Sequence, residues 1–289
     1  MTDIDTTPAR TFDMLGVTVD RALRESSFAP GLSMALTDRD LVLSENSHGL
    51  ADLAAARPVV ASTLFEIGSI SKGFTCALLL QARDEGLLDL DRPVTTYLPW
   101  FQVRSRFAPI TIRHLMTHTA AIMSDLGSGA DAAFDVWSLR DTDATAAPGS
   151  WFHYSNVGYK ALGMVLQAVY QRPYQDILSE RLLRPLGMTE AESAITHQTR
   201  RRLAVGYEPF YDDRPSRRED GLVPATWLET ATADGSIAAT ARDMTAWLRL
   251  LMCGGIGPDG AQLIETRSVH EMLTPAIDAE ERGHRTASA

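Results

Sequence analysis

The sequence is poor in cysteine and in basic charge. Cys76 and Cys253 are the two cysteines of the 289-residue chain, too few for a disulfide scaffold and not spaced as a zinc site. Acidic residues outnumber basic ones by 37 to 27, which leaves a net charge of −10 and no basic stripe to neutralise phosphates. These shortages exclude a disulfide-rich domain and argue against nucleic acid as a partner.

Long apolar segments are also missing. No stretch approaches the roughly 20 apolar residues that a membrane-spanning helix needs. Residues Met1–Arg10 are polar and mixed in charge, so they lack the apolar core of a secretory signal. From the chain as given, we expect no membrane span and a cytoplasmic location.

Two motifs of well-known hydrolases are incomplete. No full Gly-x-Ser-x-Gly is present, which weighs against an α/β-hydrolase fold. His114 and His118 have the i, i+4 spacing of a helical metal pair, but no glutamate adjoins them as in His-Glu-x-x-His, and no third ligand is obvious. We therefore expect two structural histidines, no metal and no cofactor.

What the sequence does contain is a Ser-x-x-Lys pair, Ser69 and Lys72, before the apolar run Cys76–Ala82, which predicts a buried helix. We expect Ser69 at or just inside the start of this helix, with both side chains on one face. A serine hydroxyl is a weak nucleophile until a neighbour takes its proton. A lysine can do so when burial and a positive helix terminus lower its pKa from about 10.4. For the motif alone, a capping serine and a solvated lysine are the commoner interpretation.

A second polar pair, Tyr154 and Asn156, stands two residues apart. In an extended segment both side chains would point the same way. A phenol can pass a proton, and a carboxamide can bind a substrate carbonyl. Taken alone, the pair is more often an aromatic turn that packs before a helix.

Hydrophobic periodicity and turn residues predict the remaining framework. A β-hairpin is expected from Leu32–Leu36 and Leu41–Leu43, and Thr111 is expected to cap a helix. Helices are predicted over 11–25, 157–170, 174–183 and 241–252, with one more helical turn over 269–273.

Taken together, these motifs resemble the serine β-lactamase-like superfamily, in the branch that holds class C β-lactamases, family VIII esterases and D-alanyl-D-alanine carboxypeptidases. The resemblance covers about 30–275 and is carried by Phe65-Glu66-Ile67-Gly68-Ser69-x-x-Lys72, Thr111–Thr119, Tyr154-x-Asn156, Glu85–Asp91, Pro185–Met188 and Gly235-Ser236-Ile237.

The resemblance implies an α/β (α+β) fold of the β-lactamase/transpeptidase type, with an antiparallel sheet flanked by helices and a mostly helical lobe. A single domain over 1–289 is expected. Its α/β lobe would comprise 1–86 and 235–289, and its helical lobe 87–234.

The resemblance also implies a mechanism. Ser69 would attack an ester or amide carbonyl and form an acyl-enzyme, while Lys72 and Tyr154 move the proton and Asn156 holds the substrate. The backbone N–H of Ser69 would supply half of an oxyanion hole. The partner would be a small ester, amide or β-lactam, and the oligomeric state stays open.

One departure from the family pattern stands out. The family carries a third motif, Lys-Thr-Gly or His-x-Gly, on a strand beside the site, and none follows Gly255. The C-terminal strands of the family are missing as well, so the hairpin would lose its neighbours and the central helix would expose apolar surface. We favour the hypothesis of a longer enzyme cut short, with a natural, impaired short form as the alternative.

Three functions stay open at this point. The first is an esterase-like serine hydrolase. The second is a penicillin-binding D-alanyl-D-alanine carboxypeptidase or a β-lactamase. The third is a non-catalytic relative that keeps the pocket but does not turn over.

Overall fold

The computed structural model describes residues 8–25, 29–125, 131–211, 213–215, 217 and 220–277. Contacts within the chain divide it into two compact units. Unit 1 comprises Met1–Ile67, Leu183–Glu229 and Ile237–Ala261, and unit 2 comprises Gly68–Leu182, Thr230–Ser236 and Gln262–Ala289. The lobe boundaries expected from the sequence stay a prediction.

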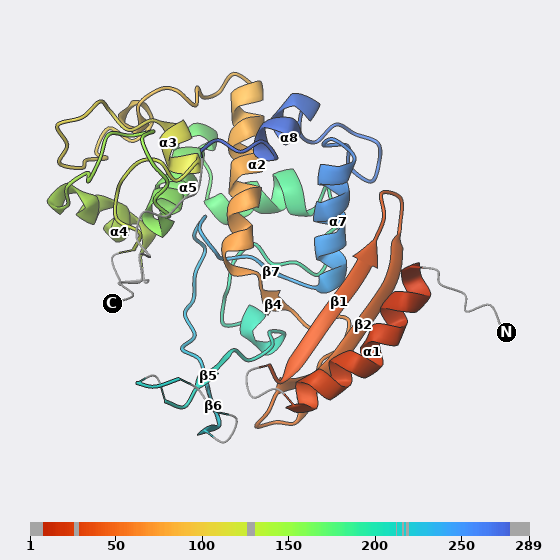
Figure 1. The fold of residues 1–289 in the computed structure, drawn as a ribbon. Coiled ribbons are helices and arrows are strands. Elements are labelled where there is room, and N and C mark those ends of the chain that lie inside the picture. Colours follow the sequence, from red (N-terminus) through yellow and green to blue (C-terminus); the bar gives the residue numbers. More distant parts are fainter. Residues whose placement is uncertain are drawn as a thin grey trace, which may run out of the picture. The chain divides into compact units, whose positions relative to one another are not determined.

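Unit 1 is built on an antiparallel hairpin. Strand β1 (Gly31–Thr37) pairs with β2 (Val42–Asp52), and the short β3 (Arg57–Pro58) pairs with the other edge of β2. Helix α1 (Pro8–Glu25) packs mainly along β2, and α7 (Ala241–Met252) packs along β1 (Figure 1). The predicted hairpin and both helices are confirmed. The hairpin is not isolated, because α1 and α7 pack on it, but β1 is an edge strand in the described part of this sheet.

Two smaller sheets complete unit 1. Strand β4 (Phe65–Glu66) pairs with β7 (Ala238–Ala239), and β5 (Tyr207–Pro209) pairs with β6 (Leu222–Pro224), both antiparallel. A 3₁₀ turn, η5, covers Thr199–Arg201. The side chains that pack between these segments form a small buried cluster of Leu64, Ile195, Leu203 and Ala238.

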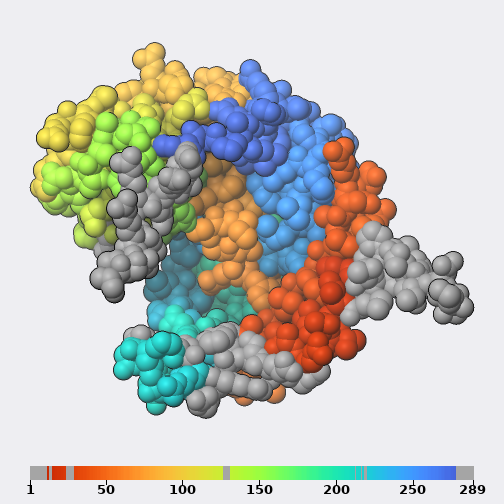
Figure 2. All heavy atoms as spheres, viewed as in Figure 1, coloured from red at the N-terminus to blue at the C-terminus, as the bar shows by residue number. Residues whose placement is uncertain are grey.

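Unit 2 surrounds helix α2 (Ser71–Asp84), which the 3₁₀ turn η1 (Gly68–Ile70) precedes. The buried helix predicted from Cys76–Ala82 is confirmed. Apolar residues of α2 such as Phe74 and Leu78 are fully buried, so the expected exposed apolar surface is not found on them. Helices α5 (Asn156–Tyr170), α6 (Tyr174–Leu178) and α8 (Thr266–Met272) pack against α2. In Figure 2, α8 (deep blue) lies against α2 (orange).

The remaining helices of unit 2 are short. Helices α3 (Ile112–Met116) and α4 (Ala132–Ser138) both pack against α5. The turns η2, η3 and η4 cover Val94–Thr96, Leu139–Asp141 and Ser179–Leu183. The helix predicted over 157–170 is confirmed, and the one predicted over 174–183 consists of α6 followed by the wider turn η4. Residues 126–130, between α3 and α4, lie outside the described residues.

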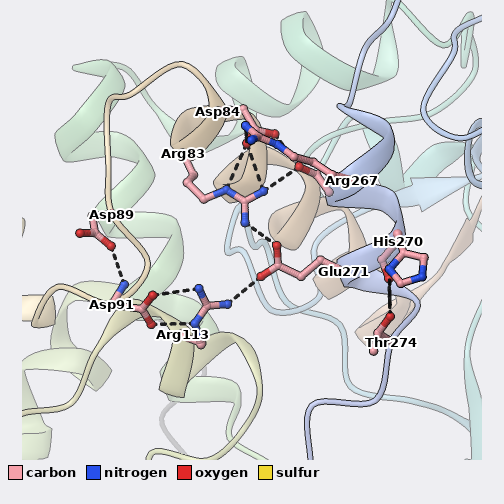
Figure 3. A network of polar contacts seen from close by, with 10 residues as sticks. Arg83, Asp84, Asp89, Asp91, Arg113, Arg267, His270, Glu271 and Thr274 are labelled. Atoms are coloured by element: carbon pink, nitrogen blue, oxygen red, sulfur yellow. Dashed lines mark hydrogen bonds and ion pairs between the residues drawn. The ribbon is translucent and has the colours of Figure 1, made fainter.

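A network of ion pairs ties α8 to the rest of unit 2 (Figure 3). Glu271 of α8 accepts hydrogen bonds from Arg83 at the end of α2 and, at 2.6 Å, from Arg113 of α3. Arg113 also pairs with Asp91 through two hydrogen bonds of 2.7 and 3.0 Å. Asp84 accepts from Ser268 Oγ at 2.5 Å. These contacts hold α2, α3 and α8 together at one end of α2.

Candidate active site

Ser69 lies in η1, immediately before α2. Its side chain is exposed, whereas Lys72, in the first turn of α2, is only 5% exposed. The expectation that Ser69 stands at or inside the helix start needs a small correction, because α2 begins at Ser71. The backbone before α2 is nevertheless helical at Ile70, so the one-turn spacing of Ser69 and Lys72 is retained. Gly68 has a φ of +52°, a value that L side chains rarely adopt, and it turns the chain into η1.

The Lys72 amine is surrounded by three oxygen acceptors. Its Nζ donates to Ser69 Oγ at 3.0 Å, to Asn156 Oδ1 at 2.8 Å and to the backbone carbonyl of Asp234 at 2.7 Å. An ammonium would offer one N–H to each of these oxygens, whereas a neutral amine would keep a lone pair that can face Ser69 Oγ. The amine is therefore held in one place beside the serine hydroxyl.

The Tyr154 phenol also contacts Ser69. Its Oη forms a hydrogen bond with Ser69 Oγ. Lys72 Nζ also lies 4.9 Å from the centroid of the Tyr154 ring and 5.5 Å from that of Tyr159. The structure thus brings Ser69, Lys72 and Tyr154 together, with the serine oxygen in contact with both an amine and a phenol.

Asn156 reaches the site from the first turn of a helix. Ser155 is the N-cap of α5: its Oγ accepts from the Gly158 N–H at 3.0 Å and donates to the Met123 carbonyl at 2.6 Å. The extended segment assumed for the Tyr154 pair therefore ends at Ser155, because α5 begins at Asn156. The Asn156 Nδ2 donates to Asp125 Oδ2 at 3.4 Å, which aims Oδ1 at Lys72.

The Asp234 carbonyl is a site group that the sequence did not reveal. The segment that carries it is held against α2 and α5: Thr75 Oγ1 donates to the Ala233 carbonyl at 2.7 Å, and Gly163 faces Ala233. A Cβ at position 163 would come within 2.6 Å of the Ala233 Cβ. The only sequence signal was the small-residue character of the segment 233–237.

The two histidines have separate contacts. His114 Nδ1 accepts the backbone N–H of Thr111 at 3.1 Å as part of a capping box at the start of α3. His118 Nδ1 accepts the backbone N–H of Ser155 at 3.0 Å. Both contacts support the structural interpretation. Among the residues that the structure describes, no three His, Cys, Asp or Glu side chains are grouped to hold a metal ion.

Other features of the described residues lie apart from the four predicted site residues. Both cysteines are free thiols, and burial raises the pKa of the Cys76 thiol to about 11. The described part of unit 1 contains a cavity of about 720 Å³, whose lining includes Arg57, Arg201 and Trp227 but none of the four predicted site residues. Within the described ranges, no helix has the length and apolar character to cross a membrane.

Comparison with known proteins decides the family. The family model described as "Beta-lactamase" matches residues 19–287. The chain belongs to the beta-lactamase family. Members of this family are serine hydrolases. In this beta-lactamase family chain, the Ser-x-x-Lys pair and the Tyr-x-Asn pair are in hydrogen-bond contact with each other. The resemblance inferred from the motifs is confirmed.

The individual relatives are similar to this chain at about 30% sequence identity. The chain is 29% identical to penicillin-binding protein 4 of Amycolatopsis lactamdurans over 257 residues, which is 86% of this chain and 66% of that protein. It is 30% identical to protein Flp of Staphylococcus aureus (strain N315) over 220 residues, which is 71% of this chain and 44% of Flp. The chain thus spans less than two thirds of the length of these curated relatives.

Solved structures confirm the β-lactamase/transpeptidase-like fold. The octameric penicillin-binding protein homologue of Pyrococcus abyssi superposes with a TM-score of 0.75 at 26% identity, over 96% of this chain and 62% of that one. EstCE1, a hydrolase with promiscuous acyltransferase activity, superposes with a TM-score of 0.76 at 22% identity, over 94% of this chain and 80% of that one. The expected combination of helices with antiparallel strands is therefore correct.

Proposed function

We propose that this chain is an esterase-like serine hydrolase that forms an acyl-enzyme at Ser69 on a small ester or amide. One observation carries the proposal: Ser69 Oγ is hydrogen-bonded both to the Tyr154 phenol and, at 3.0 Å, to Lys72 Nζ. A hydroxyl held between two groups that can exchange protons is the arrangement that nucleophilic catalysis by serine needs.

The proposed reaction has two steps. Ser69 Oγ attacks the carbonyl carbon, and the carbonyl electron pair moves onto oxygen. The Ser69 proton passes to the neutral amine of Lys72, either directly or through the Tyr154 phenol, which gives up its own proton as it takes that of Ser69. The new Oγ–C bond stays while the bond to the leaving group breaks, and the leaving alcohol or amine takes the proton. Water then cleaves the acyl-enzyme and restores the Ser69 hydroxyl. Asn156 is assigned to the substrate, and its amide is oriented by Asp125.

A second candidate is a penicillin-binding carboxypeptidase or a β-lactamase. The similarity to penicillin-binding protein 4 favours it, since 86% of this chain aligns with that protein. A β-lactam is a strained amide, so the same serine would acylate with it. The two candidates differ in substrate and share the first chemical step.

The decisive experiment is intact mass spectrometry after exposure to a fluorophosphonate and, separately, to a penicillin. Ser69→Ala is the test variant. Ser71→Ala is the matched control, because Ser71 is a buried serine two residues further along the chain. We expect an adduct on the wild-type chain and on Ser71→Ala, and none on Ser69→Ala.

The outcomes separate the candidates. A penicillin adduct favours the penicillin-binding candidate, and a fluorophosphonate adduct alone favours the esterase. No adduct with either reagent, or an adduct that persists in Ser69→Ala, overturns the proposed role of Ser69 and leaves the non-catalytic relative.

A rate measurement then tests the two proton-handling groups. Tyr154→Phe removes only the phenolic oxygen, and Lys72→Met removes only the charge and the donors. We expect either change to slow acylation by about 10²- to 10⁴-fold, the usual contribution of a general acid or base. A rate within twofold of the wild type would remove that residue from the mechanism.

A further inference from the structure

His118 occupies a backbone position that usually belongs to glycine. Helix α3 ends in a Schellman motif: the Thr119 N–H donates to the His114 carbonyl at 2.8 Å, and the His118 N–H donates to the Leu115 carbonyl at 3.3 Å. The residue at this point takes a left-handed conformation, and His118 has a φ of +56°. A non-glycine residue in this conformation is strained, and such strain is retained where the surrounding structure requires that side chain.

The imidazole and the backbone of His118 hold the chain on both sides of Tyr154. The His118 carbonyl accepts the N–H of His153 at 2.7 Å, and Nδ1 accepts the N–H of Ser155 at 3.0 Å. A backbone N–H can only donate, so Nδ1 must carry a free lone pair. The neutral form with its proton on Nε2 is therefore the one that fits.

The imidazole ring also supports the phenol ring directly. The ring centroids of His118 and Tyr154 lie 4.5 Å apart with an interplanar angle of 30°, a stacked arrangement. Tyr159 and Phe152 approach the same imidazole with centroid distances of 4.9 and 5.7 Å. His118 thus contacts Tyr154 through its ring and through both neighbouring residues.

We propose that His118 is a positioning residue, which fixes the Tyr154 phenol against Ser69 by stacking on its ring and anchoring residues 153 and 155. This proposal rests on the acyl transfer proposed above, because it acts through Tyr154. The i, i+4 spacing of His114 and His118 alone predicts only a structural histidine at this position.

The charge state of His118 agrees with this assignment. Burial lowers the pKa of the imidazole to about 4, with smaller contributions from the positive charge of Lys72 and from His153. The groups that face the ring are Lys72 from α2, His153 and Tyr154 from the preceding loop, and Tyr159 from α5. The ring therefore stays neutral at physiological pH and keeps Nδ1 as an acceptor.

Two substitutions of His118 separate the stacking of its ring on Tyr154 from the hydrogen bond that its Nδ1 accepts. His118→Asn tolerates the left-handed backbone and places an Oδ1 acceptor where Nδ1 lies, but it removes the ring. His118→Phe keeps a stacked ring and loses the acceptor. The matched control is His114→Asn, because His114 lies in α3, just before the turn that holds His118, and its Nδ1 also accepts a backbone N–H, from Thr111 at 3.1 Å.

The kinetic readout is acylation by the fluorophosphonate over a range of concentrations. We expect both His118 variants to lower the maximal acylation rate by about 10- to 100-fold, since a small displacement of a reacting group has effects of this size. The half-saturating concentration should change little, because the effect is on the phenol. His114→Asn should stay within twofold of the wild type.

A second readout does not depend on activity. This readout is the NMR chemical shift of ¹³Cζ-labelled tyrosine, in which Tyr154→Phe identifies the Tyr154 signal. We expect that signal to shift in both His118 variants and to keep its position in His114→Asn. If the wild type is not acylated at all, the proposed function fails, and this signal still tests the positioning of Tyr154. A Tyr154 signal and an acylation rate in His118→Asn that equal those of His114→Asn would overturn the inference.

Discussion

Lys72 and Asp234 are 162 residues apart in the sequence, and the Nζ of Lys72 donates to the Asp234 carbonyl at 2.7 Å. This contact supplies the third acceptor of the amine, beside Ser69 and Asn156. Because the acceptor is a backbone atom, its position depends on the path of the segment 230–236. Anything that displaces this segment should therefore act on the candidate site.

Gly163 in α5 is the first place to test this dependence. Alanine is the better helix former by about 1 kcal/mol, but a Cβ at 163 would come within 2.6 Å of the Ala233 Cβ. We expect Gly163→Ala to lower the free energy of unfolding by about 1–3 kcal/mol, the range for overpacking, and to slow acylation of Ser69. Denaturant titration and the acylation rate measure the two effects.

The control for this prediction is the double variant Gly163→Ala with Ala233→Gly. It removes the methyl group that the new side chain meets, and the next contact, Ala233 N at 3.6 Å, is an ordinary one. The two changes should be non-additive, with partial recovery of both stability and rate. Equal losses in the single and double variants would show that the close contact is not the cause.

The pair of Lys160 in α5 and Asp135 in α4 is buried. Their side chains are 5% and 0% exposed, and Nζ donates to Oδ2 at 2.6 Å. Burial alone would lower the pKa of Lys160, but the hydrogen bond to Asp135 and the charges of Asp234 and Asp125 raise it overall. Asp135→Asn should cost about 3–5 kcal/mol of unfolding free energy, because it leaves a buried ammonium without its main partner.

The comparison variant replaces both partners, with Asp135→Leu and Lys160→Met. Replacing a buried ion pair by apolar residues of similar size is often neutral or stabilising. We therefore expect the double variant to unfold at a higher denaturant concentration than Asp135→Asn. The reverse order would mean that the charge on Lys160 is not what makes the single change costly.

Glu271 provides a pH-dependent prediction for the network of Figure 3. Burial raises its pKa, but the hydrogen bonds and charges of Arg83 and Arg113 outweigh burial, and the pKa is lowered. Its contribution to stability is therefore present above the unfolded pKa of about 4.3 and is lost as the pH falls below it. Glu271→Gln should cost about 0.5–1 kcal/mol at pH 7, because the group is partly exposed.

Unfolding of wild type and Glu271→Gln at pH 7 and pH 3 checks this prediction. The difference between them should shrink at the lower pH, and also in about 1 M salt, where the Debye length is about 3 Å. A difference that stays constant across pH would assign the effect to shape or packing instead of charge.

His118 should make stability fall at mildly acidic pH. An unfolded histidine has a pKa of about 6.5, and burial lowers that of His118 to about 4. Between these values the unfolded chain binds a proton that the folded chain does not, so the free energy of unfolding decreases as the pH falls. The loss should reach no more than about 3 kcal/mol.

Denaturant titrations between pH 7 and 4 of the wild type and His118→Asn measure this slope. The variant should lack the part that His118 contributes, whereas His114→Asn should keep it. Parallel curves for the wild type and His118→Asn would contradict the lowered pKa.

The sequence was informative where a local rule decides the geometry. Ser69 and Lys72 could be paired because helical spacing brings residues three apart onto one face, and that holds although α2 begins only at Ser71. Tyr154 and Asn156 were paired on the assumption of an extended segment, whereas Asn156 already belongs to α5. The pairing was therefore useful for a partly incorrect reason, and the catalytic roles of these residues stay a prediction.

The features that could not be predicted from the sequence depend on contacts between distant segments of the chain. A carbonyl group at Asp234 has no side-chain signature, and the stacking of His118 on Tyr154 follows from how α3 ends beside the loop before α5. The second hairpin strand was predicted too short, since Ser44–His48 is polar and shows no apolar alternation, yet it pairs with β1 throughout. The two lobes and the truncation hypothesis also stay predictions.

Unit 2 is built from three separate segments of the chain, which limits how the candidate site can be isolated in a shorter protein. The chain enters this unit at Gly68, leaves after Leu182, returns for Thr230–Ser236 and returns again at Gln262. The Asp234 carbonyl lies in the short middle segment, Thr230–Ser236. No uninterrupted peptide that stops before residue 230 can therefore carry the full set of contacts around Lys72. A shorter protein that keeps these contacts needs a linker in place of residues 183–229, so that Leu182 is still joined to Thr230.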